Sequence, residues 1–207
     1  MLLDGAVLGS GPTGVVLAHE SPADLCGWVP YAQVLSRAGF HVLLFDHRHF
    51  GFSDSPTDPS KSGHYTRDNA AAVEELKRDG AKHVFLMGAS FGGITSMVAG
   101  SRLGSKIAGV ISVSGEAMLG NTEGPNDELD AMAAVPKLRV PFLALNSQQD
   151  GIALASDARE LVRRAGSTHK RSVLFPGGDH GWDMLDIASY RARASRIVID
   201  FLRRYGR

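Results

Sequence analysis

The chain has 207 residues, of which 43% are hydrophobic, and this length suits one domain with a substantial core. Lys plus Arg and Asp plus Glu both number 22, so the formal net charge of +0 gives no electrostatic reason to expect a nucleic-acid or membrane partner. Cys26 is the only cysteine, which excludes an internal disulfide, and because neither a signal-peptide pattern nor a membrane-length apolar run occurs, we expect a cytoplasmic protein.

Six continuous apolar runs, rich in Val, Ile, Leu and Phe, predict parallel β-strands that are buried on both faces. They are Val15–Ala18, His41–Phe45, His83–Met87, Ile107–Val113, Val140–Leu145 and Arg171–Phe175. Helical patterns alternate with them near Trp28–Ala38, Arg67–Asp79, Phe91–Leu103, Ser156–Ala165 and Ala188–Tyr205. The alternation predicts a doubly wound, mostly parallel α/β sheet with helices on both faces. No repeat or linker divides the chain, so we expect residues 1–207 to form a single domain.

The segment Gly115–Pro136 is the one irregular stretch of the sequence. Residues Gly120–Pro125 predict a loop, and Asn126–Ala134 predict a short helix with Asn126 as its N-cap. Such a segment is too small to fold as a cap. We therefore expect a minimal cap or none, and an open site.

Residues Gly88–Gly92 read G-x-S-x-G, between a strand-like run and a segment with helical spacing. A serine between glycines at a strand-to-helix turn is a nucleophile elbow, in which a sharp turn projects the hydroxyl and admits only small residues two positions away. The N-terminus of the following helix favours developing negative charge. An ordinary tight turn is the alternative, but the flanking elements favour Ser90 as a catalytic nucleophile.

A serine nucleophile needs a base, and the base needs an acid that orients it. Asp150 and His180 each lie in a loop after a predicted strand, so both are expected at the carboxyl edge of the sheet with Ser90. We therefore predict Asp150 as the acid and His180 as the base. The alternatives are a turn-forming Asp before Gly and a surface-loop histidine. The competing acids are Glu116, Asp179 and Asp183.

An oxyanion hole needs backbone N–H groups directed at the developing charge. One is expected from Phe91, the residue after the nucleophile. The other is expected from the loop after Val15–Ala18, with Ser21 as the first choice and Glu20 as the second. The alternative for this loop is a simple strand end.

Two further patterns suggest other chemistry but lack its context. Gly9–Gly14 matches G-x-G-x-x-G, yet a strand follows where dinucleotide binding requires a helix, so we expect a β-turn. Asp46, His47 and His49 resemble a metal cluster, but no further ligand is spaced to close it. We therefore expect neither a cofactor nor a metal. Three aromatic residues either line a pocket or pack in the interior, namely Trp28, Tyr31 and Phe50.

With these residues placed, the chain resembles the α/β-hydrolase superfamily over nearly its whole length. It looks most like the small, capless bacterial serine esterases related to dienelactone-hydrolase-like and acylglycerol-lipase-like enzymes. The resemblance rests on Gly88–Gly93, on Gly177–Trp182 and on Phe45–Ser53, which is similar to the family's D-x-R-G-x-G-x-S loop. It implies an α/β-hydrolase fold, a short N-terminal hairpin, and acyl hydrolysis through an acyl-enzyme without metal or cofactor.

Three positions depart from the family pattern. Glu20 follows His19 where the family usually has His-Gly, and we expect its carboxylate to hold the loop by turning to a cation or a hydroxyl, for instance Arg48 or a polar substrate group. The alternative is that its negative charge opposes the developing oxyanion and weakens the oxyanion hole. His49 replaces the usual glycine of the second loop. Ser90 stands where dienelactone hydrolases proper carry a cysteine, which argues against that reaction.

The leading interpretation is a carboxylic-ester hydrolase for small or medium soluble esters, because an open site buries little of a long acyl chain. A thioesterase, an amidase or a cofactor-free perhydrolase would use the same triad, so these activities remain open. The alternative from another class is a non-catalytic binding protein with the same fold, although such proteins usually lack the serine or the histidine. The sequence leaves the oligomeric state open.

Overall fold

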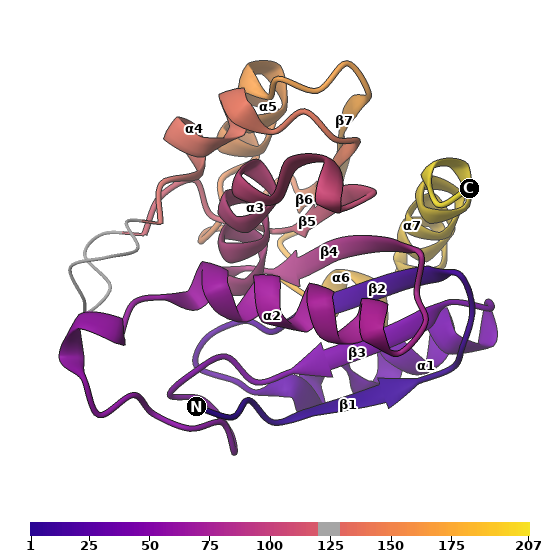
Figure 1. Ribbon diagram of the computed structural model, residues 1–207. Helices are drawn as coiled ribbons and strands as arrows, with labels where there is room; N and C mark the ends of the chain where they lie inside the picture. The colour runs from indigo at the N-terminus through magenta and orange to yellow at the C-terminus, as the bar shows by residue number, and fades with distance from the viewer. Residues whose placement is uncertain (120–128) are drawn as a thin grey trace.

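The apolar runs assemble into one seven-stranded sheet with the order β1-β3-β2-β4-β5-β6-β7 (Figure 1). The computed structural model describes residues 1–119 and 129–207. Strands β2 to β7 run parallel, and β1 pairs antiparallel with β3 at one edge. The strands are β1 Gly5–Leu8, β2 Thr13–Ala18, β3 His41–Phe45, β4 His83–Ala89, β5 Gly109–Val113, β6 Phe142–Ser147 and β7 Lys170–Phe175. All six strands expected from the sequence are therefore present, and the doubly wound, mostly parallel sheet is confirmed.

Strand β1 is the one that the sequence analysis misses. It has only four residues, Gly5-Ala6-Val7-Leu8, and three of them are exposed, so its short apolar stretch is not a core strand signal. Its pairing with β3, from Gly5 opposite Phe45 to Leu8 opposite Val42, holds it at the edge of the sheet. The residues that follow lead into β2, so Gly9–Gly14 connects two strands and does not begin a helix.

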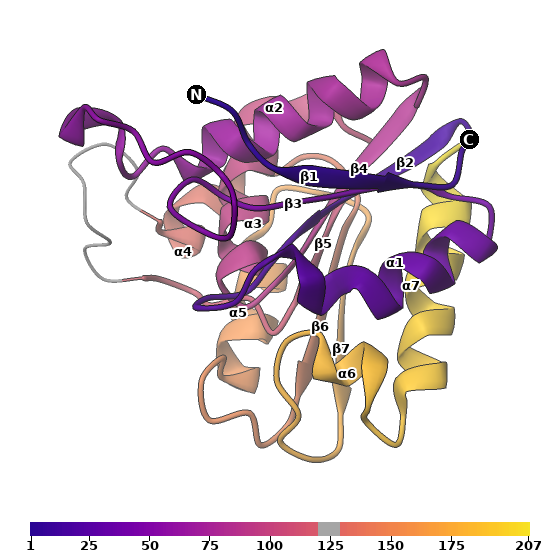
Figure 2. The same cartoon turned by 90° about the horizontal axis from the view of Figure 1, so that it is seen from below.

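Helices cover both faces of the sheet, as Figures 1 and 2 show. One face carries α2 Tyr65–Arg78, α3 Phe91–Leu103, α4 Ala131–Ala134 and α5 Ala155–Arg164. The other carries α1 Val29–Arg37, α6 Asp183–Asp186 and α7 Arg191–Tyr205. Each face therefore encloses its own layer of buried apolar side chains.

Two helices differ from their expected bounds. The last predicted helix, Ala188–Tyr205, corresponds to α7, which begins at Arg191, whereas the short helix α6 before it was not expected. The short helix α4 begins after Asp130, whose carboxylate accepts a hydrogen bond from Ala133 N and so acts as the N-cap. The expected cap Asn126 lies outside the described residues, as does the expected loop at 120–125.

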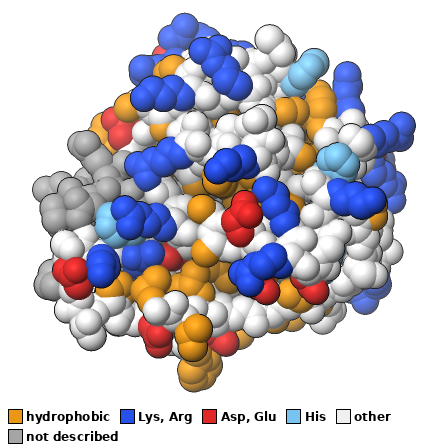
Figure 3. Space-filling model, in the orientation of Figure 1, with side chains coloured by type: hydrophobic (Ala, Val, Ile, Leu, Met, Phe, Trp, Pro, Cys, Tyr) orange, Lys and Arg blue, Asp and Glu red, His pale blue; other side chains and the backbone are white. Residues whose placement is uncertain are grey.

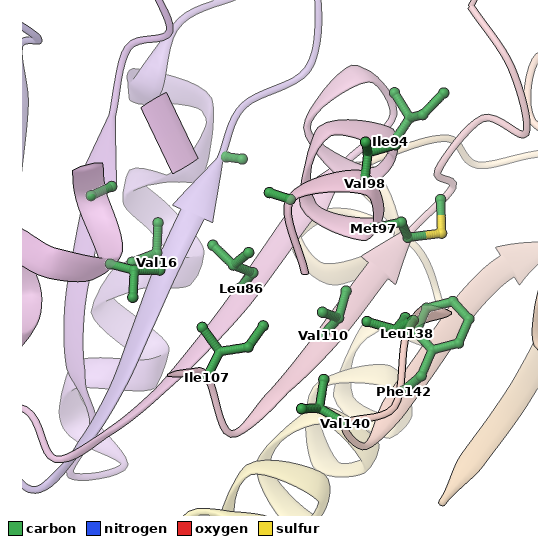
Figure 4. Close-up of a cluster of buried hydrophobic side chains, with 14 of the residues drawn as sticks. Val16, Leu86, Ile94, Met97, Val98, Ile107, Val110, Leu138, Val140 and Phe142 are labelled. Atoms are coloured by element: carbon green, nitrogen blue, oxygen red, sulfur yellow. The ribbon is translucent and has the colours of Figure 1, made fainter. Parts of the chain in front are cut away.

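Helix α3 packs on the centre of the sheet and carries the candidate site at its N-terminus. Its first ten residues are all buried, which explains why the segment is apolar or small on every side. Figure 4 shows Ile94 and Met97 of α3 above Leu86 of β4 and Val110 of β5. This close packing fixes α3 relative to the strand that precedes it.

The surface is mixed in charge. In Figure 3, Lys and Arg side chains are spread over the face that α2 and α3 cover, with Asp, Glu and hydrophobic side chains between them. Within residues 1–119 and 129–207, no helix combines the length and the hydropathy that a membrane span requires.

Candidate active site

Ser90 occupies the turn between β4 and α3 (Figure 1) in a strained backbone conformation. Its φ is 48° and its ψ is −113°, a region that non-glycine residues rarely adopt. Its N–H donates to Val113 O at 2.9 Å, which ties the turn to the end of β5. A Cβ at Gly92 would overlap the carbonyl groups of Ala18 and His19, so only glycine lets α3 approach the end of β2 this closely.

Asp150 and His180 meet at the carboxyl ends of β6 and β7. His180 Nδ1 lies 2.8 Å from Asp150 Oδ2 and 3.0 Å from Oδ1. Asp150 Oδ1 also accepts hydrogen bonds from the N–H groups of Ile152 and Ala153. Because a carboxylate accepts at Nδ1, that nitrogen carries the proton and Nε2 keeps its lone pair. Asp150 therefore orders its own turn and orients the imidazole at the same time.

The two loops converge because their backbones bind each other. Gln148 N donates to Phe175 O at 2.8 Å, and Gln149 N donates to Gly177 O at 2.9 Å. These bonds extend the β6–β7 pairing beyond the sheet and bring residues that are 30 positions apart into contact. Of the four candidate acids, Asp150 is the one in contact with Nδ1 of His180.

The hydroxyl of Ser90 donates to a different carboxylate. Ser90 Oγ lies 3.4 Å from Glu116 Oε1, which follows β5. Burial raises the pKa of the Glu116 carboxyl, the Ser90 hydroxyl and His180 lower it, and Asp150 raises it. Glu116 is thus close enough to interact with both Ser90 and the Asp150–His180 pair.

The loop after β2 is held by a buried histidine. His19 Nδ1 lies 2.9 Å from the carbonyl oxygen of Glu20, and His19 Nε2 accepts the N–H of His47 at 3.0 Å. Burial, together with the neighbouring His47, lowers the pKa of His19 to about 4. His19 is therefore a neutral bridge between the two loops. Since C=O and N–H of a trans peptide point in opposite directions, the N–H of Ser21 points away from the His19 ring.

Glu20 does not meet Arg48, whose guanidinium binds Asp68, so the expected contact with Arg48 is wrong, whereas a contact with a polar substrate group stays a prediction. Its carboxylate lies against Gly181, where a Cβ would overlap Oε2, and this oxygen is buried without a hydrogen-bond partner. Burial raises the pKa of the Glu20 carboxyl, and Asp183 adds to the rise, whereas His180 lowers it. The side chain therefore fills the space between the loop after β2 and the loop that carries His180.

Arg48 instead forms a buried ion pair that sequence reasoning missed. Its guanidinium donates to Asp68 of α2, with Nη2 to Oδ1 at 2.5 Å and Nε to Oδ2 at 2.9 Å, and both residues are at most 4% exposed. Burial acts to raise the pKa of Asp68, but His47 and Arg48 outweigh it and lower the pKa. Asp68 thus anchors the loop after β3, which supplies the N–H that His19 accepts. The signal in the sequence was the Asp-His-Arg loop itself, but its partner on α2 lies 20 residues away.

The residues considered as metal ligands have separate partners. Asp46 accepts the N–H groups of Leu25 and Phe52, and His49 Nε2 lies 2.9 Å from Ser62 Oγ. The described part of the chain holds no group of three or more His, Cys, Asp or Glu side chains arranged for a metal ion. His49 has a φ of 69°, so it adopts the left-handed conformation that the family's glycine would adopt more easily.

Two of the three aromatic candidates for a pocket belong to the interior. Trp28 is fully buried and its Nε1 donates to Ala18 O, and Tyr31 is 2% exposed. Phe50 is half-buried, with its ring 4.9 Å from His19 and 5.7 Å from Phe91. Only Phe50 therefore lies at the edge of the candidate site.

Comparison with known protein families identifies one family that matches the chain. A family model described as "alpha/beta hydrolase fold" matches residues 15–136, which is more than half of the chain. The chain is 34% identical over 91 residues to Epoxide hydrolase 3 of Siraitia grosvenorii, and 32% identical over 107 residues to Serine hydrolase BPHL of Mus musculus. These stretches cover 43% and 52% of this chain but 28% and 32% of the relatives, so the chain matches about a third of their length.

Solved structures resemble the protein over nearly all of its length. The monoacylglycerol lipase of Paleococcus ferrophilus has a TM-score of 0.81 at 19% identity, covering 99% of this chain and 100% of that chain. The thermophilic esterase of Thermogutta terrifontis has a TM-score of 0.79 at 19% identity, with coverage of 99% and 94%. The enol-lactonase of Burkholderia xenovorans has a TM-score of 0.77 at 21% identity, with coverage of 97% and 96%. At these identities the likeness concerns the fold.

The neutral state of His19 predicts a specific pH dependence of stability. The pKa of His19 is about 4 in the folded protein, against 6.5 for the free side chain, so between these values the unfolded chain binds more protons. The free energy of unfolding should therefore fall by about 3 kcal/mol as the pH drops from 6.5 to 4 because of this one group. Below the folded pKa its contribution is constant. Urea unfolding of wild type and His19→Gln at several pH values measures it: the wild-type advantage should shrink on acidification, and parallel curves would contradict the bridge.

The packing of Glu20 predicts that its shape matters more than its charge. Glu20→Ala should remove the side chain that supports Gly181 and lower the free energy of unfolding by about 1 to 2 kcal/mol. Glu20→Gln keeps the shape and should retain most of that stability, as judged by Tm. A Gln variant as unstable as the Ala variant would show instead that the charge holds the loops together.

Proposed function

The chain belongs to the α/β-hydrolase fold family, and from this premise we propose that it is a serine hydrolase that cleaves carboxylic esters through an acyl-enzyme. The observation that carries the proposal is Ser90 held at φ 48° at the N-terminus of α3, on the sheet edge where His180 contacts Asp150 at 2.8 Å. Strain of this kind at a helix N-terminus is costly unless it serves to project the hydroxyl. The substrate class is a small-molecule ester.

In the proposed reaction, Ser90 Oγ attacks the ester carbonyl carbon while His180 Nε2 accepts the hydroxyl proton. This requires the hydroxyl to turn from Glu116 to His180, because in the resting structure it donates to Glu116. Asp150 then stabilises the imidazolium that forms. The imidazolium returns its proton to the leaving alcohol, and a water molecule activated by the same imidazole releases the acid from Ser90.

The negative charge of the tetrahedral intermediate needs two N–H donors. We propose the amide of Phe91, which lies in the first turn of α3 where N–H groups have no partner within the helix. We propose the amide of Ser21 as the second, since the Glu20 carbonyl is turned to the His19 ring. The amide of Glu20 is the remaining candidate for this second position.

The proposed roles predict that the nucleophile and base act as one unit. Ser90→Ala and His180→Ala should each lower kcat for p-nitrophenyl acetate by at least about 10³-fold, and the double variant should be little worse than either. Circular dichroism and Tm report whether the fold is intact, and a fluorophosphonate probe should label wild type but not Ser90→Ala. Losses that multiply in the double variant would contradict a shared step.

The role of the acid is tested separately. Asp150→Asn should lower kcat by about 10²- to 10⁴-fold, because the imidazole loses the partner that fixes its tautomer. Glu116→Gln serves as the comparison, since Glu116 contacts the serine and not Nδ1 of the histidine. If Asp150→Asn stays near normal while Glu116→Gln loses hydrolysis of neutral esters, the acid is Glu116.

A further inference from the structure

A carboxylate lies directly at the proposed nucleophile. Glu116 Oε1 is 3.4 Å from Ser90 Oγ, and the residue is half-buried. Among the described residues, no lysine or arginine forms an ion pair with it. The basic side chain that acts on its carboxyl is His180, whose Nδ1 is itself engaged with Asp150. The Glu116 carboxylate is therefore not balanced by a lysine or arginine side chain of the described residues.

The position is unfavourable for the hydrolysis of a neutral ester. Attack by Ser90 places negative charge on the substrate oxygen, and a carboxylate close to it opposes that charge in a partly desolvated site. The carboxylate also accepts a hydrogen bond from the Ser90 hydroxyl, whose proton must pass to His180 in the proposed reaction. A positive group on the substrate would remove both problems, because it would neutralise Glu116 and take over the lone pair to which Ser90 donates.

Other carboxylates near His180 raise the pKa of one another, so they too would be stabilised by a positive group. Asp150 and Asp183 act on the Glu20 carboxyl, and Asp179 and Asp186 act on that of Asp183. The basic side chain acting on both of these carboxyls is again His180. Several carboxyl groups therefore lie around His180, although the whole chain has a formal net charge of +0. A local excess of carboxylates favours the approach of cations over that of anions.

We propose that Glu116 is a specificity-determining residue that binds a cationic group of the substrate, so that the preferred substrates are esters with an ammonium group near the scissile bond. This inference rests on the proposed ester hydrolysis at Ser90. It adds a substrate class that the fold does not specify, because the family fold is compatible with many substrates.

Matched esters that differ only in charge test the inference. On the alcohol side, acetylcholine is compared with its uncharged isostere 3,3-dimethylbutyl acetate. On the acyl side, ethyl 4-(trimethylammonio)butanoate is compared with ethyl 5,5-dimethylhexanoate. Wild type should favour the cationic member of at least one pair by about tenfold or more in kcat/KM. Glu116→Gln should bring that ratio close to one, because the variant loses the charge that favours the cationic member.

The control variant is Asp186→Asn, which removes one negative charge from an exposed residue close to Asp183 without contacting Ser90. At physiological ionic strength it should keep most of the wild-type ratio, because exposed charges are screened over about 8 Å. Equal losses in Asp186→Asn and Glu116→Gln would assign the preference to the general field and not to Glu116.

Two outcomes would overturn the inference while leaving the proposed function intact. One is Ser90-dependent hydrolysis with ratios near one for both pairs. The other is a Glu116→Gln variant that slows charged and neutral esters equally, as a merely structural role would. If no ester is cleaved, the proposed function fails, and the cation site is then decided by labelling. Tetramethylammonium should slow the fluorophosphonate labelling of wild type but not that of Glu116→Gln. Wild-type labelling rates that are equal with and without tetramethylammonium would refute the cation site.

Discussion

The close approach of α3 to the end of β2 is the constraint on which the site depends. At Gly92 the backbone of α3 lies against the carbonyl groups of Ala18 and His19, and any side chain there would separate the two elements. That contact sets the distance between the helix N-terminus and the loop that begins at His19. Because the first ten residues of α3 are buried, the helix cannot shift to relieve a clash, so the elbow at Ser90 keeps its strained conformation.

A chain of buried polar groups supports the other side of the site. Asp68 on α2 binds Arg48, and the loop of Arg48 supplies the His47 N–H that His19 Nε2 accepts. His19 Nδ1 in turn hydrogen-bonds the carbonyl oxygen of Glu20. Each link is a charged or polar group removed from water, which is stable only when every partner is present. Here these buried polar groups hold a loop, which has no helix or strand pairing to fix the direction of its amide groups. Rigidity at Ser90 comes from apolar packing, whereas rigidity at the facing loop comes from hydrogen bonds.

The sequence was sufficient for the parts of the structure that follow a local pattern. The six parallel strands and α3 have an apolar signal, although the edge strand β7 is partly exposed, and the order of motifs at strand ends placed Ser90, Asp150 and His180 on one edge of the sheet. Strand β1 was missed because it has only four residues and is held at the exposed edge by backbone pairing with β3. The Arg48–Asp68 pair and the contact of Glu20 with Gly181 were missed because they join segments whose approach only the folded chain defines. The catalytic roles stay predictions, since geometry alone does not measure a rate.

The electrostatics of the site divide its carboxyls between two purposes. Asp150 accepts hydrogen bonds from two backbone N–H groups and the imidazole, so its charge is matched within the protein and would stabilise the imidazolium of the proposed reaction. Glu20 and Glu116 are less fully paired, because burial is the largest influence on each carboxyl and raises its pKa, although His180 and the Trp182 N–H lower the pKa of Glu20. Glu20 packs against the loop that carries His180, so it would act on a substrate only at a distance. Glu116 accepts a hydrogen bond from Ser90, so in the proposed reaction a cation bound there would free the serine hydroxyl for His180.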